Sequence, residues 1–174
     1  NFQTIKAFQL MWLTLSRPNE SVQAEWVEFD LDKALWTIPA RRMKARREHV
    51  VPLPTQAVEL LKAMHPITGH TKFVFPNRDD RQRPMADAAL RQALKKLGWA
   101  TKYSPHGTRT TGSTRLNEMG YRPDAIEAQL AHAEPNSVRR TYNHATYLDE
   151  RRVMMQDWAD KLDGWKTHAR KDAN

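Results

Sequence analysis

Several side chains spread along the sequence belong to the types that bind phosphate or transfer protons. They are Arg17, Lys44, His106, Arg109, His132 and Tyr142. A guanidinium presents paired donors to phosphate oxygens and stays charged at any relevant pH. Histidine donates hydrogen bonds or shuttles protons. A tyrosine phenol, with a reference pKa of about 10, becomes a nucleophile as it loses its proton. The set suits chemistry at a phosphodiester, because fixed donors can meet the charge that develops there.

Each of these residues also has an ordinary structural explanation when it is taken alone. Arg17 and Glu20 could form a helix-terminal ion pair, which is a common feature of proteins. Lys44 could be one charge in a solvated basic turn, and His132 could be a partly buried histidine that buttresses its surroundings. The pattern His-x-x-Arg occurs often by chance. The order of the residues and their local context therefore carry the argument.

The tyrosine has rivals. Tyr147 lies just downstream of Tyr142 in the same segment, whereas Tyr121 follows Gly120 and reads as a packing residue. The spacing from His132 and the place before the last helix favour Tyr142 as the nucleophile.

Composition narrows the class of protein. The chain has 174 residues, 40% of them hydrophobic, which is the size and content of one domain with a sizeable core. A formal net charge of +8 favours a polyanionic partner such as nucleic acid. Charged residues interrupt every apolar stretch, so we expect a soluble protein of the cytoplasm. The absence of cysteine excludes disulfides and thiolate metal sites.

The elements that must position these residues are mostly helices. An apolar segment from Asn1 to Leu15 delivers Arg17, and Pro18 can open a new helix. From Trp26 the pattern changes to short apolar runs that predict a small antiparallel sheet. Its second and third strands would be joined by Ala40 to Glu48, a turn that carries Lys44. The turn also holds candidate DNA-binding arginines, namely Arg41, Arg42, Arg46 and Arg47.

The remaining sequence predicts helices. They are Thr55 to Met64 with Thr55 as N-cap and Pro66 and Gly69 ending it, Ala86 to Leu97, His106 to Met119, a helix opened by Pro123, a short one capped by Asn136 or Ser137 that reaches Tyr142, and Leu148 to Leu162 followed by a polar basic tail. The fold class is therefore mainly α with a small antiparallel β-sheet.

In this order the residues resemble the catalytic domain of the tyrosine recombinases, the lambda-type phage and prophage integrases. The family's Arg-x-x-Glu motif is matched by Arg17 and Glu20, its strand-turn lysine by Lys44, and its His-x-x-Arg box by His106 and Arg109. Its Leu-Gly-His box is matched by Leu130-Ala131-His132 and its nucleophile by Tyr142. Two positions depart from the pattern: Thr108 stands where Leu is frequent, and Ala131 stands where Gly is frequent.

The resemblance implies a site-specific recombinase that cuts and rejoins DNA through a covalent 3′-phosphotyrosine, with no cofactor and no metal. Lys44 would protonate the leaving 5′-oxygen and His106 would accept the proton of the tyrosine. Residues 1–174 would be the C-terminal catalytic domain, with the N-terminal DNA-binding domains absent. Partners would be attachment-site DNA, other protomers in a tetramer, and accessory proteins for bending and directionality.

Other functions predict different features. A metal-dependent nuclease needs converging carboxylates, whereas Glu20, Glu25, Glu28, Asp30 and Asp32 alternate with apolar residues as a solvated face would. A noncatalytic DNA-binding regulator with a recombinase fold would show the same basic surface, and a relaxing topoisomerase would share the chemistry. The motifs matched above favour the integrases over these alternatives.

Overall fold

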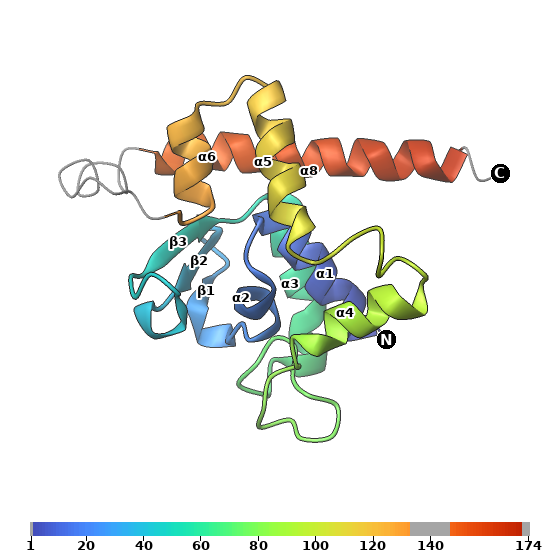
Figure 1. Cartoon of the computed structure of the whole chain (residues 1–174). Coiled ribbons are helices and arrows are strands. Elements are labelled where there is room, and N and C mark those ends of the chain that lie inside the picture. The colour runs from blue at the N-terminus through green and yellow to red at the C-terminus, as the bar shows by residue number, and fades with distance from the viewer. Residues whose placement is uncertain (1, 133–146, 172–174) are drawn as a thin grey trace.

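The computed structural model describes residues 2–132 and 147–171. The helices and strands follow in the order α1 (Phe2–Thr14), α2 (Pro18–Val22), η1 (Trp26–Glu28), β1 (Phe29–Asp30), β2 (Leu35–Ile38), η2 (Ala40–Arg42), β3 (His49–Pro52), α3 (Thr55–Thr68), α4 (Ala88–Lys96), α5 (Gly107–Glu118), α6 (Pro123–Gln129) and α8 (Leu148–Lys171). Figure 1 shows a mainly helical molecule with one small sheet, which confirms the predicted fold class. Among the described helices, none has the length and apolar character to cross a membrane.

The sheet is a three-stranded antiparallel meander in the order β1-β2-β3. Trp36 of β2 lies opposite Val51 of β3. Residues directly opposite each other share one face of the sheet, and both of these are buried. The first strand is shorter than predicted. Trp26–Glu28 forms a 3-10 turn in which the side chains of Glu25 and Glu28 bond to each other's backbone amides, so only Phe29–Asp30 pairs with β2.

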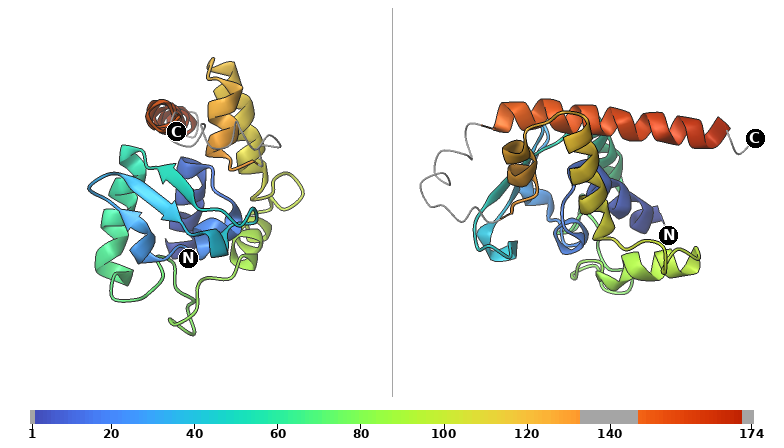
Figure 2. Two further views of the ribbon diagram at one scale, coloured as in Figure 1. Left: turned by 90° about the vertical axis from the view of Figure 1, so that its left-hand side faces the viewer. Right: turned by 45° about the horizontal axis from the view of Figure 1, so that its top comes forward.

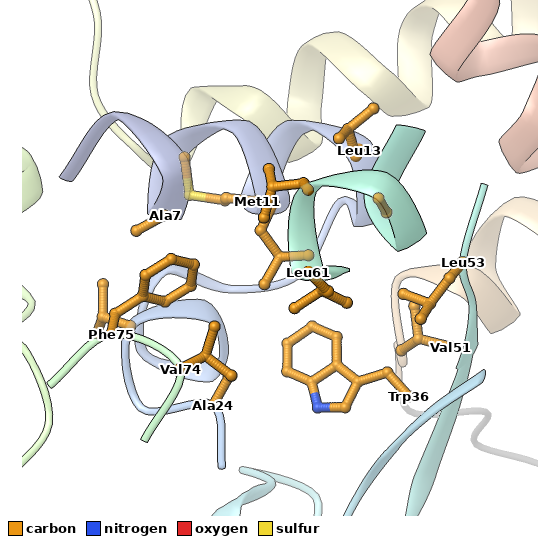
Figure 3. Packing of buried hydrophobic residues seen from close by; sticks show 14 of the residues in the cluster. Ala7, Met11, Leu13, Ala24, Trp36, Val51, Leu53, Leu61, Val74 and Phe75 are labelled. Atoms are coloured by element: carbon orange, nitrogen blue, oxygen red, sulfur yellow. The ribbon is translucent and has the colours of Figure 1, made fainter. Parts of the chain in front are cut away.

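Two clusters of buried side chains make up the core. The larger one lies among α1, α3 and the sheet, where Met11, Trp36, Leu61 and Phe75 pack together (Figure 3). The smaller one joins the end of α1 to α5, α6 and α8, and its members are Leu15, Leu116, Ala125, Ile126, Leu130, Met154, Met155 and Trp158. The end of α1 therefore touches both clusters.

The last helix, α8, contributes side chains to both buried clusters. In Figures 1 and 2, α8 crosses α5 and α6 at a steep angle and passes over the part of the molecule that holds α1 and the sheet, and it contacts α1, α5, α6 and β3. It continues to Lys171, so the predicted basic tail is helical as far as that residue. The predicted apolar face is present, because Met155 and Trp158 are fully buried.

The third helix also differs from its prediction. It continues past Pro66 to Thr68, where the Gly69 amide donates to the His65 carbonyl at 2.7 Å and closes the last turn. Thr55 is the first helical residue and Pro54 occupies the N-cap position. The Thr55 amide donates to the side-chain oxygen of Gln156 on α8 at 2.9 Å. A distant side chain thus caps the helix, which local sequence could not reveal.

Candidate active site

Arg17 lies at the junction between α1 and α2, as the N-cap residue of α2. Pro18 begins this helix because its fixed φ suits the first helical position. The buried carboxylate of Glu20 accepts hydrogen bonds from the Arg17 amide and from its Nη1, both at 2.7 Å. The same guanidinium donates from Nη2 to the Ala131 carbonyl at 3.4 Å. The helix-terminal ion pair is therefore present, and it holds the Arg17 guanidinium in one orientation.

Arg109 lies in the first turn of α5 and bridges two main-chain carbonyls. Its Nη1 donates to the Leu15 oxygen at 2.7 Å, and its Nη2 donates to the Leu130 oxygen. Burial lowers the pKa of Arg109 to about 10, with the positive charge of Arg17 as the next contribution. Glu20 acts in the opposite direction. At neutral pH Arg109 remains a cation.

The two arginines thus come together from distant parts of the sequence. Arg109 binds the Leu130 carbonyl and Arg17 binds the next one, that of Ala131. Like charges repel at short range, so neutral carbonyl acceptors and one carboxylate are what hold them side by side. A pair of adjacent cations of this kind is suited to an anion with several oxygens.

A cavity of about 540 Å³ opens beside Arg17 and brings further predicted residues to the same place. It is lined by Arg17, Pro18, Asn19, Glu20, Arg41, Arg42, Met43, Lys44, Arg46, Asp87, Arg91, Ser104, Pro105 and His106. Lys44 and His106 are both exposed on its wall. Arg109, His132 and Arg47 are not among its lining residues.

The basic turn between β2 and β3 contains two kinds of arginine. Arg41, Arg46 and Arg47 are exposed, and Arg41 reaches the carboxylate of Glu25 at 3.2 Å. The side chain of Arg42 is only 9% exposed, pairs with a buried glutamate and donates to a main-chain carbonyl. The arginines of this turn therefore differ in their surroundings: three face solvent, whereas Arg42 packs the turn against the body of the molecule.

The acids expected on a solvated face lie inside instead, and this expectation was wrong for three of them. Glu20, Glu25 and Glu28 are 4%, 8% and 7% exposed. Each has a cationic partner, and Glu28 pairs with Arg42 while it accepts a hydrogen bond from the Trp36 indole at 2.9 Å. Pairing is what makes burial of a carboxylate tolerable. Among the described residues, no group of three His, Asp or Glu side chains is placed to hold a metal ion.

His132 follows α6 and pairs with Glu127, whose Oε2 lies 2.5 Å from its Nδ1. The ring is exposed. Just before it, Ala131 has a left-handed backbone with φ of 49°, a conformation that glycine adopts more easily. The Leu130-Ala131 carbonyls of this box hold both arginines, a role that sequence reasoning missed. The sequence signal for this role was that the family usually has glycine at position 131, which indicates an unusual backbone conformation there.

Tyr142 lies outside the described residues, as do Asn136 and Ser137 and the short helix predicted there. The rival Tyr147 is described. It is 8% exposed, its hydroxyl donates to Asp124 at 3.3 Å, and it accepts from Arg122 at 3.2 Å. The Arg122 guanidinium also lies 5.0 Å from the ring centroid. A buried phenol with both of its hydrogen-bonding roles filled has the surroundings of a packing residue.

Comparisons with known proteins agree on one family. The model of the phage integrase family matches residues 2–148. Prophage integrase IntA of Escherichia coli (strain K12) is 47% identical over 152 residues, covering 86% of this chain and 37% of that protein. Prophage integrase IntZ of the same strain is 48% identical over 158 residues, covering 90% and 39%. The integrase of Enterobacteria phage P4 is 43% identical over 173 residues, also covering 90% and 39%. The chain thus spans about two fifths of the length of these relatives.

Solved structures share the fold at lower identity. An integrase from mycobacterium phage Brujita matches with a TM-score of 0.70 and 19% identity over 90% of this chain and 51% of that one. XerA recombinase matches with 0.58 and 16% over 86% and 60%. The Tn1549 transposon integrase in complex with circular intermediate DNA matches with 0.56 and 16% over 82% and 53%.

Proposed function

The chain belongs to the phage integrase family, and from this premise we propose that it is the catalytic part of a site-specific recombinase that cleaves and rejoins DNA through a covalent 3′-phosphotyrosine. The observation that carries the proposal is the pair formed by Arg17 and Arg109, which bind adjacent carbonyls, together with the basic cavity that Arg17 lines. Two fixed cations of this kind match the charge that grows on the nonbridging oxygens during attack at phosphorus.

In the proposed reaction the phenol oxygen of Tyr142 attacks the scissile phosphorus. The bond from phosphorus to the 5′-oxygen breaks, and the DNA 3′ end stays on the enzyme as a phosphotyrosine. Lys44 gives its proton to the departing 5′-oxygen, and His106 takes the proton of the phenol. Exposure of Lys44 and His106 on the wall of one cavity supports these assignments. Attack by another 5′-hydroxyl reverses the step and joins a new strand.

Each remaining residue has a proposed role. His132, which follows the two residues whose carbonyls hold the arginines, donates a further hydrogen bond or shuttles a proton. Arg41, Arg46 and Arg47 contact the DNA backbone, because they are exposed on a turn beside the cavity. Arg42 stays a prediction as a DNA contact, and its buried ion pair supports a role in holding the turn.

The proposed substrate is double-stranded DNA, and a structural neighbour that was solved with DNA supports this partner. We propose further that protomers act as a tetramer on two attachment sites in the bacterial cytoplasm, with accessory proteins for bending and direction. The formal charge of +8 supports a polyanionic partner. Cleavage without a metal ion is part of the proposal, since cations of the chain would supply the charge.

Covalent capture tests the proposal. The chain is incubated in EDTA with duplexes that carry a randomised segment and a nick, so that a short cleaved strand diffuses away and the adduct accumulates. Adducts that survive denaturant are recovered and sequenced. We expect them with the unmodified chain and with Tyr147→Phe, and we expect none with Tyr142→Phe or Arg109→Lys.

Other outcomes would contradict parts of the proposal. DNA that is retained only under native conditions would support the noncatalytic regulator. Adducts that disappear with Tyr147→Phe and persist with Tyr142→Phe would overturn the choice of nucleophile. Adducts that require magnesium would overturn the metal-free step.

A further inference from the structure

Gln129, the last residue of α6, joins the two segments whose carbonyls hold Arg109. Its side-chain amide donates to the Thr14 carbonyl at 2.8 Å, and the residue is only 1% exposed. Leu15 follows Thr14 and Leu130 follows Gln129, and Arg109 bridges the carbonyls of these two leucines. Two links therefore run in parallel between the same two segments. The Gln129 link fixes the separation that the Arg109 guanidinium spans.

Arg151 of α8 holds Gln129 in place. Its Nε donates to the Gln129 side-chain oxygen at 3.0 Å, and its Nη2 donates to the Val50 carbonyl of β3 at 2.7 Å. Arg151 is 1% exposed, and these partners are neutral. Burial of a cation among neutral groups is costly, and these hydrogen bonds offset part of that cost only in this geometry.

A further contact fixes the main chain of Gln129. Its carbonyl oxygen lies 3.1 Å from Nε2 of His49, which begins β3. The side chain and the main chain of Gln129 are thus both held, by α8 and by the sheet. The next two carbonyls along the chain are the ones that Arg109 and Arg17 bind.

We propose that Arg151, acting through Gln129, is a positioning residue for Arg109 and Arg17. This proposal rests on the proposed function, because the two arginines are taken as the groups that meet the scissile phosphate. Arg151 belongs to the helix that follows Tyr142 in the sequence. The link therefore connects α8 to the two segments whose carbonyls hold Arg109.

A methylphosphonate at the scissile position distinguishes positioning from simple stabilisation of the fold. It replaces one charged nonbridging oxygen with a neutral methyl group, so the reaction depends less on well-placed guanidiniums. A variant with misplaced arginines should lose much activity on phosphate and little on methylphosphonate. A variant that is only less stable should lose the same fraction on both.

The test uses Arg151→Lys, which keeps the charge but lacks the planar fork, and Gln129→Glu, which keeps the acceptor for Arg151 but loses the donor to Thr14. The neighbouring Arg152 donates to the Lys33 carbonyl at 3.0 Å, and Arg152→Lys serves as the matched control. We expect adduct formation on phosphate to fall roughly tenfold to hundredfold in both test variants. On methylphosphonate the fall should be several-fold smaller, with DNA affinity unchanged. Equal losses on the two substrates would overturn the proposal.

A second measurement needs no activity. Hydrogen bonds from Nη1 and Nη2 of Arg109 to two different carbonyls hinder rotation about its Nε–Cζ bond, the rotation that exchanges the two nitrogens, so the two Nη signals should be separate in NMR spectra of the unmodified chain. In Arg151→Lys and Gln129→Glu they should merge, and in Arg152→Lys they should not. Separate signals in all variants would contradict the positioning role. Absence of any adduct with the unmodified chain would instead count against the proposed function.

Discussion

Arg17 and Arg109 bind the carbonyl oxygens of neighbouring residues, Ala131 and Leu130, at the end of α6. Carbonyl acceptors orient a guanidinium without cancelling its charge, and Arg17 has the Glu20 carboxylate as a further partner. Each guanidinium has five N–H donors, and the contacts of Arg109 with Leu15 and Leu130 occupy only part of this set. The remaining donors are held in a fixed direction before any ligand arrives, which is the condition for electrostatic stabilisation of a transition state.

The first prediction concerns the pKa of Arg109. Burial and, next to it, the neighbouring charge of Arg17 together lower it to about 10. Removing a like charge favours the protonated form, so Arg17→Met should raise the pKa of Arg109. The control is Arg151, whose pKa is also lowered to about 10, by burial alone, and it should not move. Titration of the arginine ¹³Cζ shifts measures both. An unchanged Arg109 would mean that the two guanidiniums are not close.

The second prediction concerns the backbone at Ala131, where φ is 49°. This conformation costs a residue with a Cβ atom roughly 1–2 kcal/mol, and glycine avoids that cost. Glycine also gives the unfolded chain more conformational freedom, which offsets about 0.4–1 kcal/mol of the gain. Ala131→Gly should therefore stabilise the fold by up to about 1.6 kcal/mol. Adduct formation should persist, because the carbonyl that binds Arg17 remains. Ala128→Gly, inside α6, should have the opposite sign. Urea unfolding compares the two.

The third prediction concerns Gly112, which faces Leu15. A Cβ atom built on Gly112 would lie too close to the side chain of Leu15, whose carbonyl holds Arg109. Gly112→Ala should destabilise the fold by about 1–3 kcal/mol and slow adduct formation. Gly164 is the control, since nothing lies within 4 Å of its added Cβ. Gly164→Ala should stabilise α8 by about 0.5–1 kcal/mol. Thermal unfolding and adduct yield report both effects.

Sequence alone could predict the positions of most helices and the basic turn. Helical spacing, Pro18, Pro123 and the glycines after α4 and α5 are local signals, and local hydrogen bonding decides where such elements begin and end. Gly98 and Gly120 have φ of 73° and 88°, as their places after these helices indicate. The helices that ran further than predicted are α3 and α8. At the end of α3 the Thr68 carbonyl accepts a hydrogen bond from the distant Trp26 indole at 3.0 Å, which the local pattern does not show. The last turns of α8 are exposed and bond within the helix.

Sequence could not predict which charges lie inside. Glu28 and Asp32 look alike in the chain, yet Glu28 is 7% exposed and Asp32 is exposed. The difference arises because Arg42 and the Trp36 indole meet Glu28 from the neighbouring turn and strand. For the same reason, nothing in the local sequence indicated that Gln129 and Arg151 are buried and bond to each other. A buried polar network is defined by tertiary contacts between segments that are far apart in sequence.

The fourth prediction separates the arginines of the basic turn. Arg42→Met leaves the buried Glu28 carboxylate without its cationic partner, so the free energy of unfolding should fall by roughly 3–5 kcal/mol. Arg46→Met, on the exposed side of the turn, should change stability by less than about 0.5 kcal/mol. It should weaken DNA binding and lower the salt dependence of binding by about one counterion. Urea unfolding and binding titrations at several salt concentrations check this. Equal stabilities of the two variants would contradict the buried role of Arg42.

The last prediction tests Lys44 as the acid that protonates the departing oxygen. Lys44 is exposed on the cavity wall, and Lys44→Met removes the proton without a large change in shape. Loss of a general acid should slow adduct formation by roughly 10²–10⁴-fold on ordinary DNA. If sulfur replaces the bridging 5′-oxygen, the leaving group is a thiolate whose conjugate acid has a pKa of about 8.5, so it departs without a donor. The variant should then match the unmodified chain.

Arg47→Met, from the same turn, is the control for Lys44→Met and should affect both substrates equally through DNA binding. A Lys44→Met defect of the same size on the sulfur substrate would show that Lys44 acts by binding and not by proton transfer.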